Sequence, residues 1–116
     1  MFLQSSDLKV YLALGYTDMR KAINGLSIIV EDLNLDPFSG HLFVFCNRRR
    51  KILKILYWDS NGFCLWQKRL EKDNFKWPKT EAEVMQLDHR QLRWLLDGMN
   101  ISQRNAHRKL HYQTVL

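Results

Sequence analysis

Disulfide frameworks, membrane spans and secretion signals are all missing from this sequence. Its 116 residues include two cysteines, Cys46 and Cys64, too few for the disulfide framework of a small secreted domain. Each lies within an apolar run, so we expect two buried free thiols. No segment approaches the roughly 20 apolar residues of a membrane-spanning helix. The N-terminal residues lack the features of a signal peptide, and we therefore expect a cytoplasmic protein with no membrane partner.

Acidic residues are scarce in one part of the chain. Residues 48–72 contain eight basic and two acidic side chains, so this stretch alone carries the formal net charge of +6. The remaining ten basic and ten acidic residues balance. One concentrated positive region is typical of a protein that binds a polyanion.

Hydrophobic patterning predicts an α+β domain. Residues 8–14 alternate as a strand, and apolar residues on one helical face follow at residues 18–33, with Thr17 or Asp18 as the cap. Three aromatic and β-branched segments between residues 41 and 70, joined by short turns, predict hairpins, and residues 75–77 could add a short strand. Asp88 and Gln91 resemble a capping box before a helix at residues 89–97.

These elements indicate an antiparallel β-meander of about four strands packed against two main helices. We expect one compact domain over residues 1–99 and a basic, flexible tail over residues 100–116. Both helices should cover the apolar face of the sheet. The other face and the turn at residues 47–51 should then be charged.

The basic hairpin is the best candidate for a nucleic-acid-binding site. Arginine can grip phosphates with two hydrogen bonds and lysine adds point charge, and a β-ribbon can enter a major groove. The alternative is a solubilising surface turn. The side chains expected to contact nucleic acid are Arg48, Arg49, Arg50, Lys51, Lys54, Lys68 and Arg69.

Aromatic side chains crowd the same hairpins and could stack unpaired bases, although a packed core is the simpler explanation. They are Tyr57, Trp58, Phe63, Trp66, Phe75 and Trp77.

Catalytic and metal sites have little support. The spacing of His107 and His111 suits one helical face, but no nearby acid or cysteine completes a set of ligands. Asp18 and Asp88 fit helix caps, and Asp36 and Asp59 fit turn starts, so none needs a role as a nuclease's magnesium ligand. No glycine-rich phosphate loop is present. We expect no catalytic residue, no cofactor and no metal.

Several sequence blocks together carry a family resemblance. They are TDMRK (17–21), GL (25–26), DPFSGHLFVF (36–45), YWDSNGFCLWQKRLE (57–71), FKWP (75–78) and QLRWLLDGM (91–99). In this order they resemble the accessory protein TnpB of insertion sequences of the sixty-six type, which is unrelated to the RNA-guided nuclease of the same name. The resemblance covers about residues 11–99 and leaves the tail outside.

The resemblance implies a role in DNA transposition beside a larger transposase encoded by the same element. In this family the transposase carries the acidic metal-binding residues, so no catalytic residue transfers to this chain. Two hypotheses follow: a non-catalytic subunit that binds DNA at the transposon ends through the basic hairpin, or a protein-interaction module that organises the transposase without touching DNA. An exposed edge strand could also pair two copies into a homodimer, although nothing in the sequence requires one.

Overall fold

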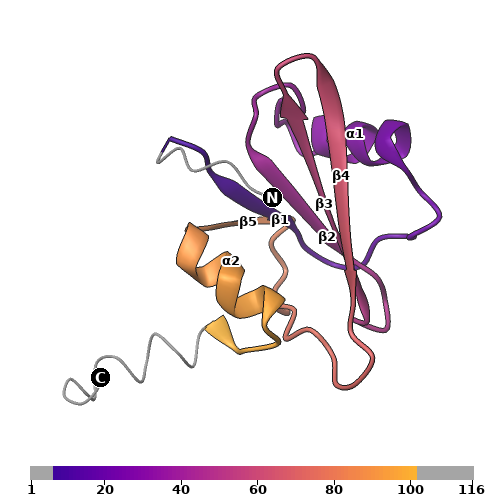
Figure 1. Cartoon of the computed structure of the whole chain (residues 1–116), viewed down its shortest axis with the longest axis vertical. Helices are drawn as coiled ribbons and strands as arrows, with labels where there is room; N and C mark the ends of the chain where they lie inside the picture. Colours follow the sequence, from indigo (N-terminus) through magenta and orange to yellow (C-terminus); the bar gives the residue numbers. More distant parts are fainter. Residues whose placement is uncertain (1–6, 102–116) are drawn as a thin grey trace.

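The computed structural model describes residues 7–101, which form a five-stranded sheet and two α-helices (Figure 1). The α+β class is confirmed. None of these helices, over the part of the chain described, is long and apolar enough to cross a membrane. The elements in chain order are β1 (Val10–Ala13), α1 (Ile23–Asp32), β2 (Leu42–Cys46), β3 (Ile52–Asp59), β4 (Gly62–Arg69), β5 (Val84–Leu87) and α2 (His89–Leu96).

The sheet has the strand order β4-β3-β2-β1-β5. Strands β2, β3 and β4 form the expected antiparallel meander. β1, however, pairs in parallel with β2, placing Val10 opposite Leu42, so the chain returns between them through α1. β5 then pairs antiparallel with β1, with Val84 opposite Ala13. The predicted meander is therefore correct for three strands, and the sheet as a whole is mixed.

Each face of the sheet is covered by one helix (Figure 1). Leu26 and Val30 of α1 pack with Phe45 on one face, and Leu92 and Leu95 of α2 pack on the other. The expectation that both helices share a single apolar face is wrong. All five residues of β2 are buried, because its alternating side chains are apolar on both faces of the sheet.

The first helix begins later than predicted. Asp18 does not cap it: its carboxylate accepts a hydrogen bond from the Arg20 amide (2.9 Å) and pairs with the Arg20 guanidinium (2.7 Å). Ala22 takes the N-cap position and offers no side-chain cap. The Asp18–Arg20 pair also lies at the surface and is not buried. A short polar side chain can satisfy nearby amides in a turn as well as in a helix.

The second helix has the predicted ends. Asp88 accepts from the Gln91 amide (2.7 Å) and the Gln91 side chain accepts from the Asp88 amide (3.1 Å), which confirms the capping box. Gly98 follows the helix with φ of +80°, and the amides of Gly98 and Met99 donate to the carbonyls of Leu95 and Trp94. These bonds form a Schellman motif, which satisfies carbonyls at the helix end.

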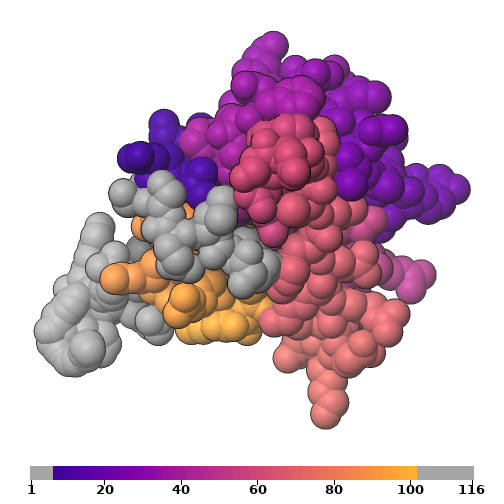
Figure 2. Space-filling view, turned by 45° about the horizontal axis from the view of Figure 1, so that its top comes forward, coloured from indigo at the N-terminus to yellow at the C-terminus, as the bar shows by residue number. Residues whose placement is uncertain are grey.

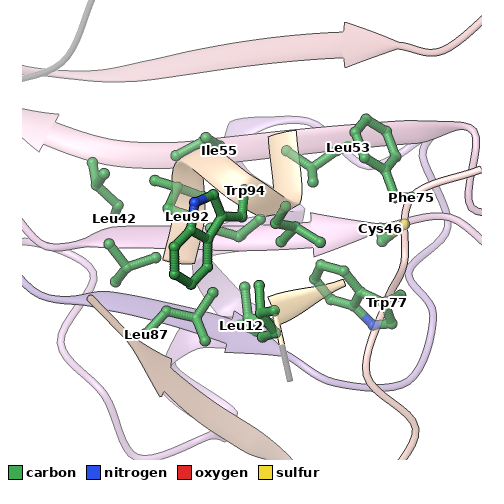
Figure 3. Close-up of a cluster of buried hydrophobic side chains, with 14 of the residues drawn as sticks. Leu12, Leu42, Cys46, Leu53, Ile55, Phe75, Trp77, Leu87, Leu92 and Trp94 are labelled. Carbon is green, nitrogen blue, oxygen red and sulfur yellow. The ribbon is translucent and has the colours of Figure 1, made fainter. Parts of the chain in front are cut away.

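The segment between β4 and β5 fills the α2 face of the sheet. Phe75 and Trp77 are buried at the end of the sheet marked by Cys46, while Trp94 lies over its centre (Figure 3). The predicted short strand at residues 75–77 is absent from the described residues. These residues run as irregular chain, since Phe75 makes one hydrogen bond to Arg50 and no strand ladder. The core continues beyond Met99 to Ile101, and the rest of the expected tail lies outside the described residues.

Candidate nucleic-acid interface

Three segments meet at one end of the sheet, and the turn at residues 47–51 carries most of their positive charge. β1 and β2 are parallel, so residues 14–22 and the turn at residues 47–51 emerge together, and the Thr17 amide donates to the Cys46 carbonyl (2.8 Å). β4 returns to the same end of the sheet. Residues 70–83 follow β4 there and are shown in salmon at the lower end of Figure 2. We call this surface, residues 14–22, 47–51 and 69–83, the basic end.

Charge is segregated along the molecule. The basic end holds ten basic and five acidic residues, a net charge of +5. The other described residues hold five basic and seven acidic residues, a net charge of −2. The positive side chains therefore gather at one end of the sheet and not along the two strands of the ribbon.

The turn between β2 and β3 is organised by Asn47. Its side-chain oxygen accepts from the amides of Lys51 (2.9 Å) and Ile52 (3.0 Å), and its carbonyl accepts from the Arg50 amide (3.0 Å). Arg50 has φ of +62° and reverses the chain. This leaves Arg48 and Arg49 exposed at the tip.

The base of this turn is braced by the chain that follows β4. The Arg50 guanidinium donates to the Trp77 carbonyl (3.1 Å), and the Lys51 ammonium donates to the Asp73 carbonyl (2.7 Å). The Asn74 side chain donates to the Arg49 carbonyl (3.0 Å). The arginines at the tip are therefore carried on a backbone that the neighbouring segment holds in place, which lowers the entropy lost when they bind a ligand.

Two predicted site residues lie elsewhere. The Lys54 ammonium is buried on the α1 side of the sheet, where it donates to the carbonyls of Met19 (2.9 Å) and Lys21 (3.0 Å). The Lys68 ammonium lies on the α2 side and donates to the Leu96 carbonyl (2.8 Å) at the end of that helix. Successive residues of a strand face opposite sides of the sheet, so Lys68 cannot share a face with its neighbour Arg69.

Of the seven predicted side chains, Arg48 and Arg49 stand free at the basic end. No hydrogen bond or ion pair joins their guanidinium groups to another residue within 7–101. Arg50 and Lys51 lie beside them with their charged groups on backbone carbonyls. Arg69 forms an exposed ion pair with Glu71 (3.1 Å), which partly neutralises it.

Tyr16 and Arg20 belong to this end but were absent from the prediction. The Arg48 guanidinium lies over the Tyr16 ring, 5.4 Å from its centroid, and Arg20 faces solvent beside them. They border an open hollow of about 580 Å³ between residues 16–20 and 47–49. The sequence could not show this proximity, because it depends on the parallel pairing of β1 with β2.

The Arg20 pair also fixes the charge state of this surface. The side-chain and backbone hydrogen bonds from Arg20 lower the pKa of Asp18 from 3.8 to about 2. Asp18 therefore stays ionised over the physiological range and offsets the charge of Arg20. The net positive charge of the hollow then comes from Arg48 and Arg49.

Three of the aspartates considered as metal ligands, Asp18, Asp36 and Asp88, make structural contacts. No group of three or more histidine, cysteine, aspartate or glutamate residues within 7–101 could hold a metal ion. Asp36 accepts from the Phe38 amide (2.9 Å), as expected for a turn start. Burial raises the pKa of the Cys46 thiol to about 12, which disfavours the nucleophilic thiolate. His107 and His111 lie outside the described residues.

Comparison with known proteins places this chain in a family. The sequence model of the IS66 Orf2-like proteins matches residues 8–106. The uncharacterized protein y4hO of Sinorhizobium fredii (strain NBRC 101917 / NGR234) is 37% identical over 101 residues, covering 86% of this chain and 88% of the relative. The uncharacterized protein y4jC of the same strain is 31% identical over 97 residues, covering 83% of each chain. No solved structure matches. The chain therefore belongs to the IS66 Orf2-like family, whose role is that of an accessory protein in transposition.

Proposed function

We propose that this chain is a non-catalytic subunit of the transposition complex that binds DNA through its basic end. The observation that carries the proposal is the presentation of Arg48 and Arg49: both are exposed and free of carboxylate partners on a turn that is braced by the chain after β4. Guanidinium groups held in this way suit the bidentate contacts that phosphate oxygens offer.

Binding should depend on phosphates more than on base sequence. Within residues 7–101 no helix is placed to enter a groove at the basic end, since α1 and α2 pack on the sheet faces. Arg48 and Arg49 are joined there by Lys21, Lys72 and Lys76, all exposed, and by the partly neutralised Arg69. Contacts of this kind position a protein on a duplex and carry little sequence information.

The first experiment compares two charge-matched double variants. Arg48→Gln with Arg49→Gln removes two charges from the basic end, and Arg90→Gln with Arg93→Gln removes two exposed charges from α2. Affinity for a short duplex carrying a transposon end should fall by at least tenfold in the first variant and by less than threefold in the second, on the order expected for lost phosphate contacts. Equal losses would mean that net charge alone drives binding.

The competing function is a protein-interaction module that organises the transposase without touching DNA. The same variants separate the two functions when the transposase is captured with the purified chain. Two results together would favour the protein-interaction module. The variant with Arg48→Gln and Arg49→Gln would still capture the transposase, and the wild-type chain would not bind DNA.

We further propose that two copies pair through the edge strand β4. Among the described strands β4 has one neighbour, β3, and the Leu70 amide donates to the Lys51 carbonyl (2.9 Å). Alternation then turns the amides of odd-numbered β4 residues outward. Gln67 is exposed and carries one of these outward amides. Light scattering should show a dimer that Gln67→Pro, which removes that amide, converts to a monomer; a monomeric wild-type chain would contradict the pairing.

A further inference from the structure

The most exposed aromatic ring in the described chain stands on a fixed backbone. Tyr16 is 65% exposed, although its neighbours are anchored on both sides. The Trp77 indole donates to the Gly15 carbonyl (2.8 Å), and the amide of the buried Thr17 donates to the Cys46 carbonyl (2.8 Å). Tyr16 therefore contributes little to the core: its backbone is held in place, and its ring remains open to a ligand.

The surroundings of the ring define the ligand. Arg48 lies over the ring and Arg49 borders the same hollow, so an aromatic surface and two guanidinium groups face one open space. A phosphate alone would not need the ring, and an apolar ligand would not need the arginines. A nucleotide with an unpaired base has both a π-face and a phosphate.

We propose that Tyr16 stacks an unpaired nucleobase while Arg48 and Arg49 hold the flanking phosphates. The site would make the chain prefer DNA with unpaired nucleotides, such as a single strand or a frayed end, over an intact duplex whose bases are already stacked. This inference rests on the proposed DNA binding at the basic end and names the form of DNA that it recognises.

The aromatic residues singled out in the sequence do not offer this site. Phe75 and Trp77 are buried in the core, and Tyr57 is 8% exposed. Trp58 packs edge to face with Phe38 and with Phe63, and Phe63 is tilted against Phe38, with ring centroids 5.1–5.2 Å apart. That cluster lies beside the β3–β4 turn, at the end of the sheet away from the arginines.

Phe38 supplies a matched control for Tyr16. Both rings are exposed, 54% for Phe38 and 65% for Tyr16, but they lie at opposite ends of the sheet. In Tyr16→Ala, affinity for a single-stranded oligothymidine should fall by about 5- to 100-fold, the range for one stacked base. Affinity for duplex DNA should change by less than twofold. Tyr16→Phe should bind like the wild-type chain, and Phe38→Ala should leave both affinities unchanged.

A second readout follows the base itself. An oligonucleotide with 2-aminopurine should lose fluorescence on binding when its base stacks on Tyr16, and Tyr16→Leu should abolish that quenching at saturating protein. Quenching that survives in Tyr16→Leu, or equal losses of single-strand and duplex affinity in Tyr16→Ala, would overturn the stacking role while leaving DNA binding intact. Absence of any DNA binding by the wild-type chain at low salt would instead overturn the proposed function.

Discussion

The indole of Trp77 donates a hydrogen bond to the carbonyl of Gly15 over 2.8 Å, across 62 residues of sequence. The bond ties the chain that leaves β1 to the chain that leaves β4. Both segments carry positive side chains, so this contact helps to hold the basic end as one surface. It also places the backbone of Tyr16 beside the turn that bears Arg48.

Replacing Trp77 should loosen this surface. In Trp77→Phe the Gly15 carbonyl loses its donor and the buried ring loses part of its volume, so we expect the free energy of unfolding to fall by about 1–3 kcal/mol. Urea denaturation followed by circular dichroism measures the change. Single-strand affinity should fall with it, because Tyr16 would no longer be held in place. An unchanged unfolding midpoint would mean that the bond contributes little.

Lys54 and Arg49 should separate stability from binding. Lys54→Met removes a buried ammonium and leaves the carbonyls of Met19 and Lys21 without their donor, and should lower the free energy of unfolding by about 1–3 kcal/mol. Its DNA affinity should match that of the wild-type chain in conditions where both are folded. Arg49→Met should show the reverse pattern, with stability nearly unchanged and DNA affinity reduced. A DNA-binding defect in Lys54→Met at unchanged stability would contradict this account. It would favour the sequence prediction that Lys54 contacts DNA.

The capping box of α2 should contribute measurably to stability. Asp88→Ala removes the acceptor of the Gln91 amide and should cost about 0.5–2 kcal/mol in the free energy of unfolding. Asp88→Ser keeps a capping oxygen and should recover most of the loss. The two variants differ little in size, so equal destabilisation by both would argue against the cap as the cause.

His41 should make the stability depend on pH. Burial, and then the nearby Lys9 charge, lower the pKa of His41 below 6.5, with Asp36 opposing them. The ring nitrogen Nδ1 accepts the Lys9 amide (3.0 Å), which a protonated ring cannot do. The unfolded chain takes up the proton first, so the free energy of unfolding should decline as the pH falls below 6.5. Urea denaturation of wild type and His41→Asn between pH 7.5 and 5 should show a smaller decline in the variant.

Local chemistry accounts for the parts of the fold that the sequence predicted. The capping box at Asp88 and the positive φ at Gly98 depend on a few neighbouring residues. The strands of the meander are joined by short turns, so their pairing is also local. The place of β1 is different, because its partners β2 and β5 lie far away along the chain. Its alternating pattern shows which side chains share a face but carries no information about which strand lies beside it.

The candidate site could also be predicted only in part, because its residues come from segments that are distant in the sequence. The excess of positive charge after residue 48 pointed to the turn that carries Arg48 and Arg49, which the structure presents at the surface. Charge counting could not show that the Lys54 ammonium is buried under the entry to α1, or that Lys68 reaches the end of α2. Nor could it find Tyr16, whose neighbours on the surface come from another part of the chain.

The salt dependence of duplex affinity tests the central claim most directly. If Arg48, Arg49 and about two of the neighbouring lysines neutralise phosphates, the slope of log K against log salt should be about −4 for the wild-type chain. It should become shallower by about 2 in the variant with Arg48→Gln and Arg49→Gln, and stay near the wild-type slope in the variant with Arg90→Gln and Arg93→Gln. A wild-type slope near zero, or the same slope in all three proteins, would contradict DNA binding through the basic end.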